Sequence, residues 1–519
     1  MAATSFRRSL ALMWRNLRSM RTALVLLLLL ALGSVAGSLV PQVANSPQRV
    51  AAMYRDHPLR AAIYERLGLF DVFGSWWFTL ITTLLLISLA GCLLPRTRAT
   101  LRNLRSRPQP AGELDGFRHY AERVVAADPA AAASACRRVL RRRWYRLNPP
   151  DGEPALAAEK GLGRDVGSLL FHWSIFLLLA GVAWGKGTGF TGFAVIPEGG
   201  CWTEAHANYD GQIREGRFFG EDHSGVTVCV RDFEDAYLPT GQPVDFVTRA
   251  ELVERPGGTR ERAEIRVNHP ASLGGVRFYQ YGYGWAPVIE IRRDGELIAS
   301  GPVTFQQDAA PRGVSQLALP WRGVLKLPGL RPQVGIEFDL WPDSRALLSF
   351  LQTGRPTPML GSFRPVLLYR AYRGDLGLTV PQRSSVLDKR GLRRWTTGAI
   401  GAGQTVDLAT GEVVRGDPER AAGITVTFAD LRRYTVLQVS RDRSLPIVLL
   451  AAVLMLVGLL PALYGSRRKL FVRAEADGEG TILKIGGFAL QRKDAFEEEF
   501  VRLVEHLERA SGRGKVGSR

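Results

Sequence analysis

The sequence predicts a membrane protein with four transmembrane α-helices, a large all-β, sandwich-like extracytoplasmic domain and a small α+β cytoplasmic domain. The first observation behind this prediction is that apolar residues, 46% of the 519-residue chain, are concentrated in four blocks. The second is that many of the arginines flank those blocks. The net charge of +19 is therefore typical of a membrane protein with basic flanking segments and does not indicate a protein that binds nucleic acid. The third is that the long stretch between the last two blocks alternates apolar and polar residues between turn dipeptides, as β-strands do.

The first span is predicted at residues 23–40, preceded by a basic cytoplasmic segment, residues 1–22. At about 18 residues the block is near the lower limit for a helix that crosses a bilayer. A cleaved signal peptide is the competing interpretation, because small residues follow the block. The long basic leader and the second apolar block soon afterwards favour a retained helix. Residues 41–75 are expected to form a short extracytoplasmic segment with helical character.

The second span is predicted at residues 76–94. It opens on Trp76 and Trp77, whose rings suit the membrane interface, and it closes on Pro95. The strongly basic residues 95–165 follow, and the positive-inside rule places them in the cytoplasm.

Within this basic segment we expect short strands around one helix. Asp128 is a suitable N-cap for that helix, and Pro129 suits its first turn. The third span follows at residues 166–184. It leads the chain outward, because the basic residues precede it.

Residues 185–444 are predicted to form the extracytoplasmic all-β domain, about half of the protein. Asp294 and Gly295 are a strong signature of a two-residue hairpin turn between two of its strands. The fourth span, residues 445–464, ends before a basic cluster that returns the chain to the cytoplasm.

The tail, residues 465–519, is predicted to be a cytoplasmic hairpin followed by an amphipathic helix. Asp494 with Glu497 three residues later is a variant of the capping box, and we expect it to open this helix. The hairpin and helix are too small for a core of their own. We therefore expect them to pack with the strands of residues 95–165.

The four cysteines, Cys92, Cys136, Cys201 and Cys229, include no CxxC pair. This excludes a zinc ribbon, a thioredoxin-like redox site and an iron–sulfur cluster of the usual spacing, and without CxxCH the chain is not itself a c-type cytochrome. Cys201 and Cys229 lie in the predicted oxidising compartment, where a disulfide can form. The sequence gives no distance between them, so the paired and the free state both remain open.

His172 is an ionisable side chain inside the third span, and such residues mark functional sites. Its helix face is apolar, with Ser168, Leu169, Ile175, Phe176 and Leu179. Neutral imidazole ligates iron and a flat apolar wall suits a porphyrin, so a haem site is one interpretation. A histidine that hydrogen-bonds a neighbouring helix is the other, and on the residues alone it is favoured.

Three further histidines, His206, His223 and His269, fall in the predicted extracytoplasmic domain. Each could ligate a metal ion or haem. Each is isolated in a loop-rich stretch, so we expect ordinary surface or hydrogen-bonded histidines.

The chain resembles the ResB family, also called CcsB, of the System II cytochrome c biogenesis machinery. The resemblance runs in order through nearly the whole chain, in SMRTALVLLLLLALGSVAGSLVPQ, LGLFDVFGSWWFTLITTLLLISLAGCLLPR, GLGRDVGSLLFHWSIFLLLAG, VRDFEDAYLPTGQPVDF, VNHPASLGGVRFYQYGYG and GGFALQRKDAFEEEF. It implies a plasma-membrane protein, with both termini cytoplasmic, that helps join haem to the CxxCH cysteines of apocytochrome c on the outer face.

The family works with a second membrane subunit of the ResC or CcsA type, which carries a tryptophan-rich haem motif that this sequence lacks. The resemblance therefore implies a non-catalytic or co-catalytic subunit of the synthase. It also implies haem b as a transient, transported substrate, a thioredoxin-like thiol reductant as a further partner, the lipid bilayer as surroundings and no nucleic acid.

The family's membrane histidine maps onto His172, which implies that His172 is an axial ligand of haem iron. The other spans contain no histidine, so the partner would supply the second ligand. Candidate surfaces for apocytochrome are residues 268–270 and an aromatic run, although packing is the expected role of most of those rings. The run comprises Phe278, Tyr279, Tyr281, Tyr283 and Trp285.

The alternative role is a scaffold that binds no haem, recruits apocytochrome c and stabilises the partner subunit. A sensor or a transporter is a third, weaker interpretation. A sensor would be expected to carry a kinase, nucleotide-binding or DNA-binding unit on the cytoplasmic side, and the sequence shows none. A transporter is hard to separate from the haem-handling role, because passing haem through the membrane is itself a transport step.

Overall fold

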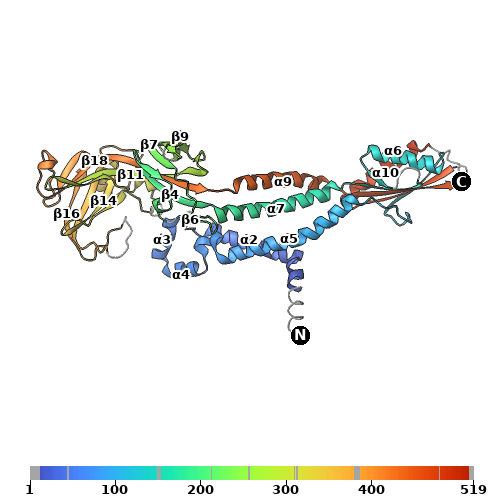
Figure 1. The fold of residues 1–519 in the computed structure, drawn as a ribbon, viewed down its shortest axis with the longest axis horizontal. Coiled ribbons are helices and arrows are strands. Elements are labelled where there is room, and N and C mark those ends of the chain that lie inside the picture. The colour runs from blue at the N-terminus through green and yellow to red at the C-terminus, as the bar shows by residue number, and fades with distance from the viewer. Residues whose placement is uncertain are drawn as a thin grey trace, which may run out of the picture. The chain divides into compact units, whose positions relative to one another are not determined.

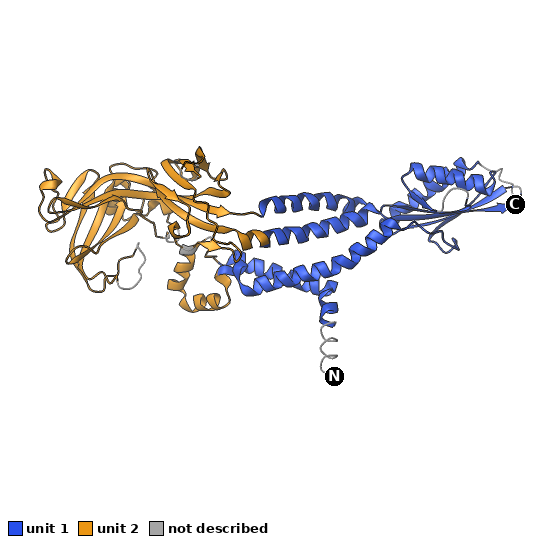
Figure 2. Cartoon of the chain, in the orientation of Figure 1, with its two compact units in different colours: residues 1–40, 71–183, 444–519 blue, residues 41–70, 184–443 orange. Residues whose placement is uncertain are grey.

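A computed structural model describes residues 12–512 apart from 44–45, 149–152, 212, 255–256, 309, 311–313, 379–385 and 479. The chain divides into two compact units (Figure 2). Unit 1 comprises Met1–Val40, Asp71–Ala183 and Ser444–Arg519, and unit 2 comprises Pro41–Phe70 and Trp184–Arg443. The N-terminal residues 1–11 of the predicted basic segment and the last residues, 513–519, lie outside the described part.

Four helices of the described chain are long and apolar enough to cross a membrane, as expected for a membrane protein. They are α2 (Met20–Leu39), α5 (Trp76–Arg105), α7 (Gly163–Thr188) and α9 (Leu445–Tyr464) (Figure 1). Each coincides with one of the four predicted apolar blocks. Ser19 and Ser75 cap α2 and α5 by accepting backbone N–H bonds within the first turn.

The second of these helices does not end before Pro95, as the sequence suggested, but continues to Arg105. A proline inside a helix leaves the carbonyl four residues earlier without its usual N–H partner. That carbonyl belongs to Gly91, and the Arg18 side chain donates to it through Nε at 3.0 Å. The arginine therefore replaces the missing backbone bond, and the helix can pass through the proline.

Small residues set the distance between α7 and α9. A Cβ on Gly167 would come within 2.7 Å of the Gly458 carbonyl oxygen, and a Cβ on Gly458 would come within 2.6 Å of the Phe171 nitrogen. In hydrocarbon, where helices gain little from burying apolar side chains against each other, such backbone contact is a main source of packing.

The sheet of unit 1 joins segments that are far apart in the sequence. Its strands, in sheet order, are β1 (His119–Val125), β20 (Gly480–Ala489), β19 (Arg468–Asp477), β3 (Ala155–Lys160) and β2 (Arg146–Asn148). Two helices, α6 (Pro129–Arg142) and α10 (Lys493–Ala510), share one hydrophobic core with these strands. The prediction that the C-terminal hairpin and helix pack with the strands before the third span is confirmed, and Asp128 caps α6 as expected.

The start of α10 differs from the predicted capping box. The chain enters the helix through Arg492 in the left-handed conformation, without a side-chain cap, and the helix begins at Lys493. Asp494 therefore lies in the first turn and not at the N-cap. Its carboxylate still favours the helix through the positive end of the helix dipole.

The described residues of unit 2 form three antiparallel sheets. The central sheet has seven strands: β10 (Ala271–Leu273), β11 (Val276–Arg293), β18 (Ile424–Arg441), β4 (Phe190–Pro197), β6 (Arg214–Glu215), β12 (Glu296–Pro302) and β17 (Gln404–Asp407). A second sheet consists of β13 (Trp321–Leu327), β14 (Gln333–Trp341), β15 (Val366–Gly374) and β16 (Leu392–Gly401). The third consists of β5 (Cys201–Thr203), β7 (Thr227–Tyr237), β8 (Pro243–Val253) and β9 (Arg260–Arg266).

The predicted single sandwich is in fact two sandwich cores that share β11 and β18. One end of this long strand pair packs on the β13–β16 sheet, with Ile291, Phe338 and Phe428 in the core. The other end packs on the β5–β9 sheet, with Phe278, Leu252 and Val439. Strands of 18 residues are long enough to serve two cores.

Local signatures within unit 2 agree with the sequence. Asp294 and Gly295, at φ values of 51° and 84°, form the tight turn from β11 to β12. The helices α3 (Pro47–Asp56) and α4 (Pro58–Arg66) lie in the segment that was expected to be helical, whereas α8 (Ser344–Thr353) is a helix within the predicted all-β domain.

Gly458→Val should loosen the contact between α7 and α9, because the added side chain would meet the α7 backbone. We expect a loss of about 1–3 kcal/mol in the free energy of unfolding, the usual cost of overpacking. Thermal unfolding of the protein in detergent measures this loss. Ala452→Val, at an exposed position of the same helix, is the matched control; equal stability of the two variants would contradict the assigned contact.

Candidate functional site

The N-terminal end of α7 is fixed by charged contacts within unit 1. The Arg467 guanidinium, in the link between α9 and β19, lies 2.5 Å from Oε1 of Glu159 and 3.2 Å from Oδ2 of Asp165. The Glu159 side chain is almost fully buried, so this pair is shielded from water. The contacts hold the first turn of α7 in place, and His172 lies two turns further along the helix.

His172 has a defined ring orientation. Its Nδ1 lies 2.6 Å from the backbone carbonyl oxygen of Ser168, one turn earlier. A carbonyl oxygen can only accept, so Nδ1 carries the proton of the neutral imidazole and Nε2 keeps its lone pair. Metal-ligating histidines are commonly oriented in this way, by a bond from the nitrogen that does not bind the metal.

The same geometry occurs at His506 on α10, where Nδ1 lies 2.6 Å from the Arg502 carbonyl oxygen. The hydrogen bond by itself therefore does not identify a ligand. What distinguishes His172 is its place in an apolar helix. Transfer of an imidazole into a membrane costs free energy, so histidines at such positions usually have a function.

Two side-chain bonds connect α5 to α7 near His172. Arg96 donates from Nη2 to Ser168 Oγ at 3.0 Å, and Trp173 donates from Nε1 to Thr97 Oγ1 at 3.0 Å. The residue whose carbonyl orients His172 thus also receives an arginine from the neighbouring helix. This places a permanent positive charge one helical turn from the imidazole.

Two of the three histidines of unit 2 are hydrogen-bonded, as expected, but the structure brings them together where the sequence showed them as separate. His206 and His223 come together at Glu215, whose Oε1 lies 2.7 Å from His206 Nδ1 and 3.1 Å from His223 Nε2. The two imidazole ring centres are 5.9 Å apart. His269 remains exposed, with Nδ1 3.2 Å from the Val267 carbonyl oxygen, as predicted.

Glu204 supports this group from the protein interior. Its side chain is 0% exposed, and its carboxylate accepts hydrogen bonds from Tyr209, His223 and Ser224. Burial opposes ionisation of this carboxyl, but the hydrogen bonds outweigh it and lower the pKa of Glu204. At His206 the hydrogen bond to Glu215 raises the pKa of the imidazole.

Cys201 and Cys229, whose pairing the sequence left open, form a disulfide between β5 and β7. The bridge closes a segment of 28 residues that contains Glu204, His206, Glu215 and His223. The histidine group therefore lies on a chain segment that is fixed at both ends.

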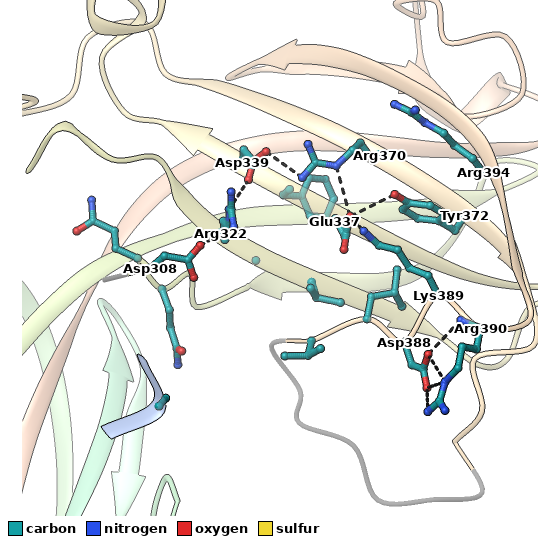
Figure 3. Close-up of a pocket in the computed structure, with 18 of the residues that line it drawn as sticks. Asp308, Arg322, Glu337, Asp339, Arg370, Tyr372, Asp388, Lys389, Arg390 and Arg394 are labelled. Atoms are coloured by element: carbon teal, nitrogen blue, oxygen red, sulfur yellow. Dashed lines mark hydrogen bonds and ion pairs between the residues drawn. The ribbon is translucent and has the colours of Figure 1, made fainter. Parts of the chain in front are cut away.

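Unit 2 also has a pocket of about 1380 Å³, whose lining includes charged residues of β13, β14 and β15 and of the segment before β16 (Figure 3). These charges pair with one another: Asp339 contacts Arg322 and Arg370, and Glu337 contacts Lys389. Carboxylates already neutralised by arginine and lysine are poor metal ligands. The pocket is therefore a mixed-charge surface and not the candidate centre.

The aromatic run on β11 divides between packing and exposure. Phe278 and Trp285 are buried, and Tyr283 stacks on Phe233 with ring centres 5.1 Å apart, so strand-face packing holds for these rings. Tyr281 is 50% exposed and contacts the Phe193 ring.

The comparisons with known proteins are consistent along the chain. The model of the "ResB-like family" matches residues 20–501. The chain belongs to the ResB-like family. Its relatives named "Cytochrome c biogenesis protein CcsB" include those of Synechococcus sp. (strain JA-2-3B'a(2-13)), 28% identical over 94% of this chain and 91% of the relative, and Thermosynechococcus vestitus, 26% identical over 97% of each. The relative from Trichormus variabilis is 24% identical over 95% of this chain and 91% of its own length.

Sequence reasoning on this ResB-like chain singled out His172 but missed the histidine group of unit 2. The members form no recognisable metal-binding motif, since His206 and His223 are 17 positions apart. The one sequence feature that points to the group is that these residues all fall between Cys201 and Cys229. If the cysteines had been assumed to pair, the intervening residues would have been expected close together.

Cys201→Ser combined with Cys229→Ser should destabilise unit 2, because opening the 28-residue loop restores conformational entropy to the unfolded chain. The chain-entropy estimate is about 3–4 kcal/mol. Denaturant unfolding followed by tryptophan fluorescence would measure the loss. Cys92→Ser serves as control, since its Sγ hydrogen bond to the Arg18 carbonyl can be kept by a hydroxyl; a double variant as stable as this control would refute the prediction.

Proposed function

We propose that this ResB-like protein acts in cytochrome c maturation as the haem-handling subunit of a System II cytochrome c synthase. The observation that carries the proposal is the similarity along nearly the whole chain to relatives named for cytochrome c biogenesis. Haem b is the transported substrate. Unit 2 presents apocytochrome c, and a ResC- or CcsA-type subunit completes the complex on the outer face of the plasma membrane.

His172 supplies one axial ligand to the haem iron in this proposal. Its Nε2 lone pair is available because Nδ1 is bonded to the Ser168 carbonyl. The half-buried apolar side chains of α7 on the same face would lie against the porphyrin. The second ligand comes from the partner subunit, since His172 is the sole histidine of the four apolar helices.

Arg96 binds a haem propionate in the same proposal. Its guanidinium donates a hydrogen bond to Ser168, one turn from His172, and this bond is exposed. The positive charge is therefore held near His172 and is accessible to a ligand. Arginine binds carboxylates through paired N–H donors, and a propionate would give it a stronger partner than a serine hydroxyl. The interaction would orient the haem edge while His172 holds the iron.

The alternative function is a scaffold that recruits apocytochrome c and stabilises the partner without binding haem. In that case the Ser168 bond of His172 would serve the helix alone, as the equivalent bond does at His506. The two functions differ in one measurable property, which is whether haem depends on His172.

His172→Ala should reduce the haem absorbance of the complex co-purified with its partner subunit at least about tenfold, because a direct iron ligand is lost. Added imidazole should restore part of the absorbance by entering the vacated position. The matched control is His506→Ala, which removes the same side-chain-to-backbone bond outside the apolar helices. Full haem content in the folded, inserted His172→Ala complex would reject the ligand role and favour the scaffold.

Arg96→Gln should weaken haem retention by about three- to tenfold without changing the ligand set, because a charge-assisted bond contributes about 1 kcal/mol or more. Haem loss to a competing haem acceptor is the measurement, and the spectrum should keep its wild-type shape. Arg102→Gln, in the last turn of the same helix, is the control. Equal rates of haem loss in the two variants would remove Arg96 from the site.

A further inference from the structure

We propose that His206, His223 and Glu215 of unit 2 form a binding site for a divalent transition-metal cation of the Zn²⁺ type. The ligand atoms of these three side chains all lie within 4.8 Å of one another. The site does not rest on the haem role of His172.

The three ligands come from different local structures. His206 begins a single-turn helix, η2 (His206–Asn208), Glu215 ends the short strand β6, and His223 lies in the loop before β7. Strand β6 is paired with β4, with Phe190 opposite Glu215. A cation at this point would join three segments that otherwise share few backbone bonds.

His223 directs one ring nitrogen to each of two carboxylates. Its Nδ1 lies 2.6 Å from the buried Glu204 carboxylate, which can only accept, so Nδ1 donates and the ring is oriented. Its Nε2 faces the Glu215 carboxylate oxygen at 3.1 Å. A proton or a metal cation can fill this second contact, and in the metal-bound state Nε2 is the ligating nitrogen.

Glu204 provides the support that metal-binding histidines usually have. A carboxylate on the far nitrogen fixes the tautomer and the direction of the ring, and it raises the basicity of the ligating nitrogen. Glu204 is itself held by the Tyr209 hydroxyl at 2.7 Å and by the Ser224 hydroxyl at 2.9 Å. Its geometry is therefore set before any ion binds.

Aromatic rings fix the imidazole of His223 further. The ring centres of Phe190 and Phe219 lie 5.3 Å and 5.2 Å from it. His223 is 13% exposed, Glu215 is 23% exposed and His206 is 65% exposed. Two ligands are thus preset, and His206 can move to close the site from the solvent side.

The donor set selects the class of ion. Two imidazoles and one carboxylate are the ligands of zinc sites with an open fourth position, while Ca²⁺ and Mg²⁺ prefer oxygen alone. Tetrahedral bonds of about 2.0–2.1 Å place ligand atoms about 3.4 Å apart. The contacts of 2.7 Å and 3.1 Å to Glu215 would therefore open slightly, which the exposed His206 permits. A porphyrin is excluded, because Glu215 lies between the two imidazoles where its plane would pass.

Zinc binding to the full-length protein in detergent tests the proposal. The protein is purified without a polyhistidine tag, stripped with a chelator and titrated with Zn²⁺ by calorimetry. Co²⁺ then serves as a spectroscopic probe, since its visible absorption reports tetrahedral nitrogen and oxygen ligands. We expect one tight equivalent per chain.

His206→Ala is the informative variant, because this side chain is 65% exposed and substitutions at exposed positions usually change stability little. We expect it and Glu215→Gln to weaken Zn²⁺ binding by about 100-fold or more, and Glu204→Gln by about 10- to 100-fold through loss of orientation. His269→Ala, an exposed histidine of the same unit outside the group, should bind as wild type.

Two results would overturn the proposal. If the wild-type protein binds no Zn²⁺ equivalent above the His206→Ala level, a proton and not a metal ion fills the space between His223 and Glu215. If binding falls equally in His269→Ala, the ion is held adventitiously by surface histidines.

Discussion

The constraint on which the rest of unit 1 depends is the backbone contact between α7 and α9. Gly167 and Gly458 permit it, since a Cβ on either residue would come within 2.7 Å of the other helix's backbone. The strands that adjoin this end of the helices are also paired: β3 leads into α7, β19 follows α9, and Lys160 lies opposite Arg468. The two apolar helices therefore run side by side from this paired end (Figure 1).

Polar groups in the apolar helices obey the rule that an unsatisfied backbone group is costly where water is excluded. The Gly91 carbonyl, which Pro95 leaves without a backbone partner, accepts a hydrogen bond from Arg18 Nε. The Ser174 hydroxyl donates to the Leu170 carbonyl of its own helix. His172 follows the same rule with one nitrogen only. Its Nδ1 is satisfied inside the helix by the Ser168 carbonyl, and Nε2 is the nitrogen to which the proposed function assigns the haem iron. This asymmetry connects the local hydrogen bonding of α7 to the proposed haem chemistry.

In unit 2 the same principle acts through a buried charge. Glu204 is tolerated at zero exposure because four donors surround its carboxylate, and one of them is His223. The carboxylate fixes the imidazole, the imidazole meets Glu215, and the disulfide between Cys201 and Cys229 keeps the segment closed around them. The geometry of the proposed cation site thus depends on the hydrogen bonds of the buried Glu204 carboxylate, which orients His223 toward Glu215.

The sequence by itself determined the elements whose physics is local. The four apolar helices, the Asp128 cap and the turn at Asp294 and Gly295 all depend on neighbours within a few residues. Tertiary structure alone decided what depends on distant partners. The sequence predicts that the second span closes at Pro95. The helix passes through this proline because Arg18, distant in the sequence, donates to the Gly91 carbonyl that Pro95 leaves without a backbone partner. The two sandwich cores, the Cys201–Cys229 bridge and the meeting of His206 with His223 likewise depend on chain folding, because pattern and spacing carry no distance between segments.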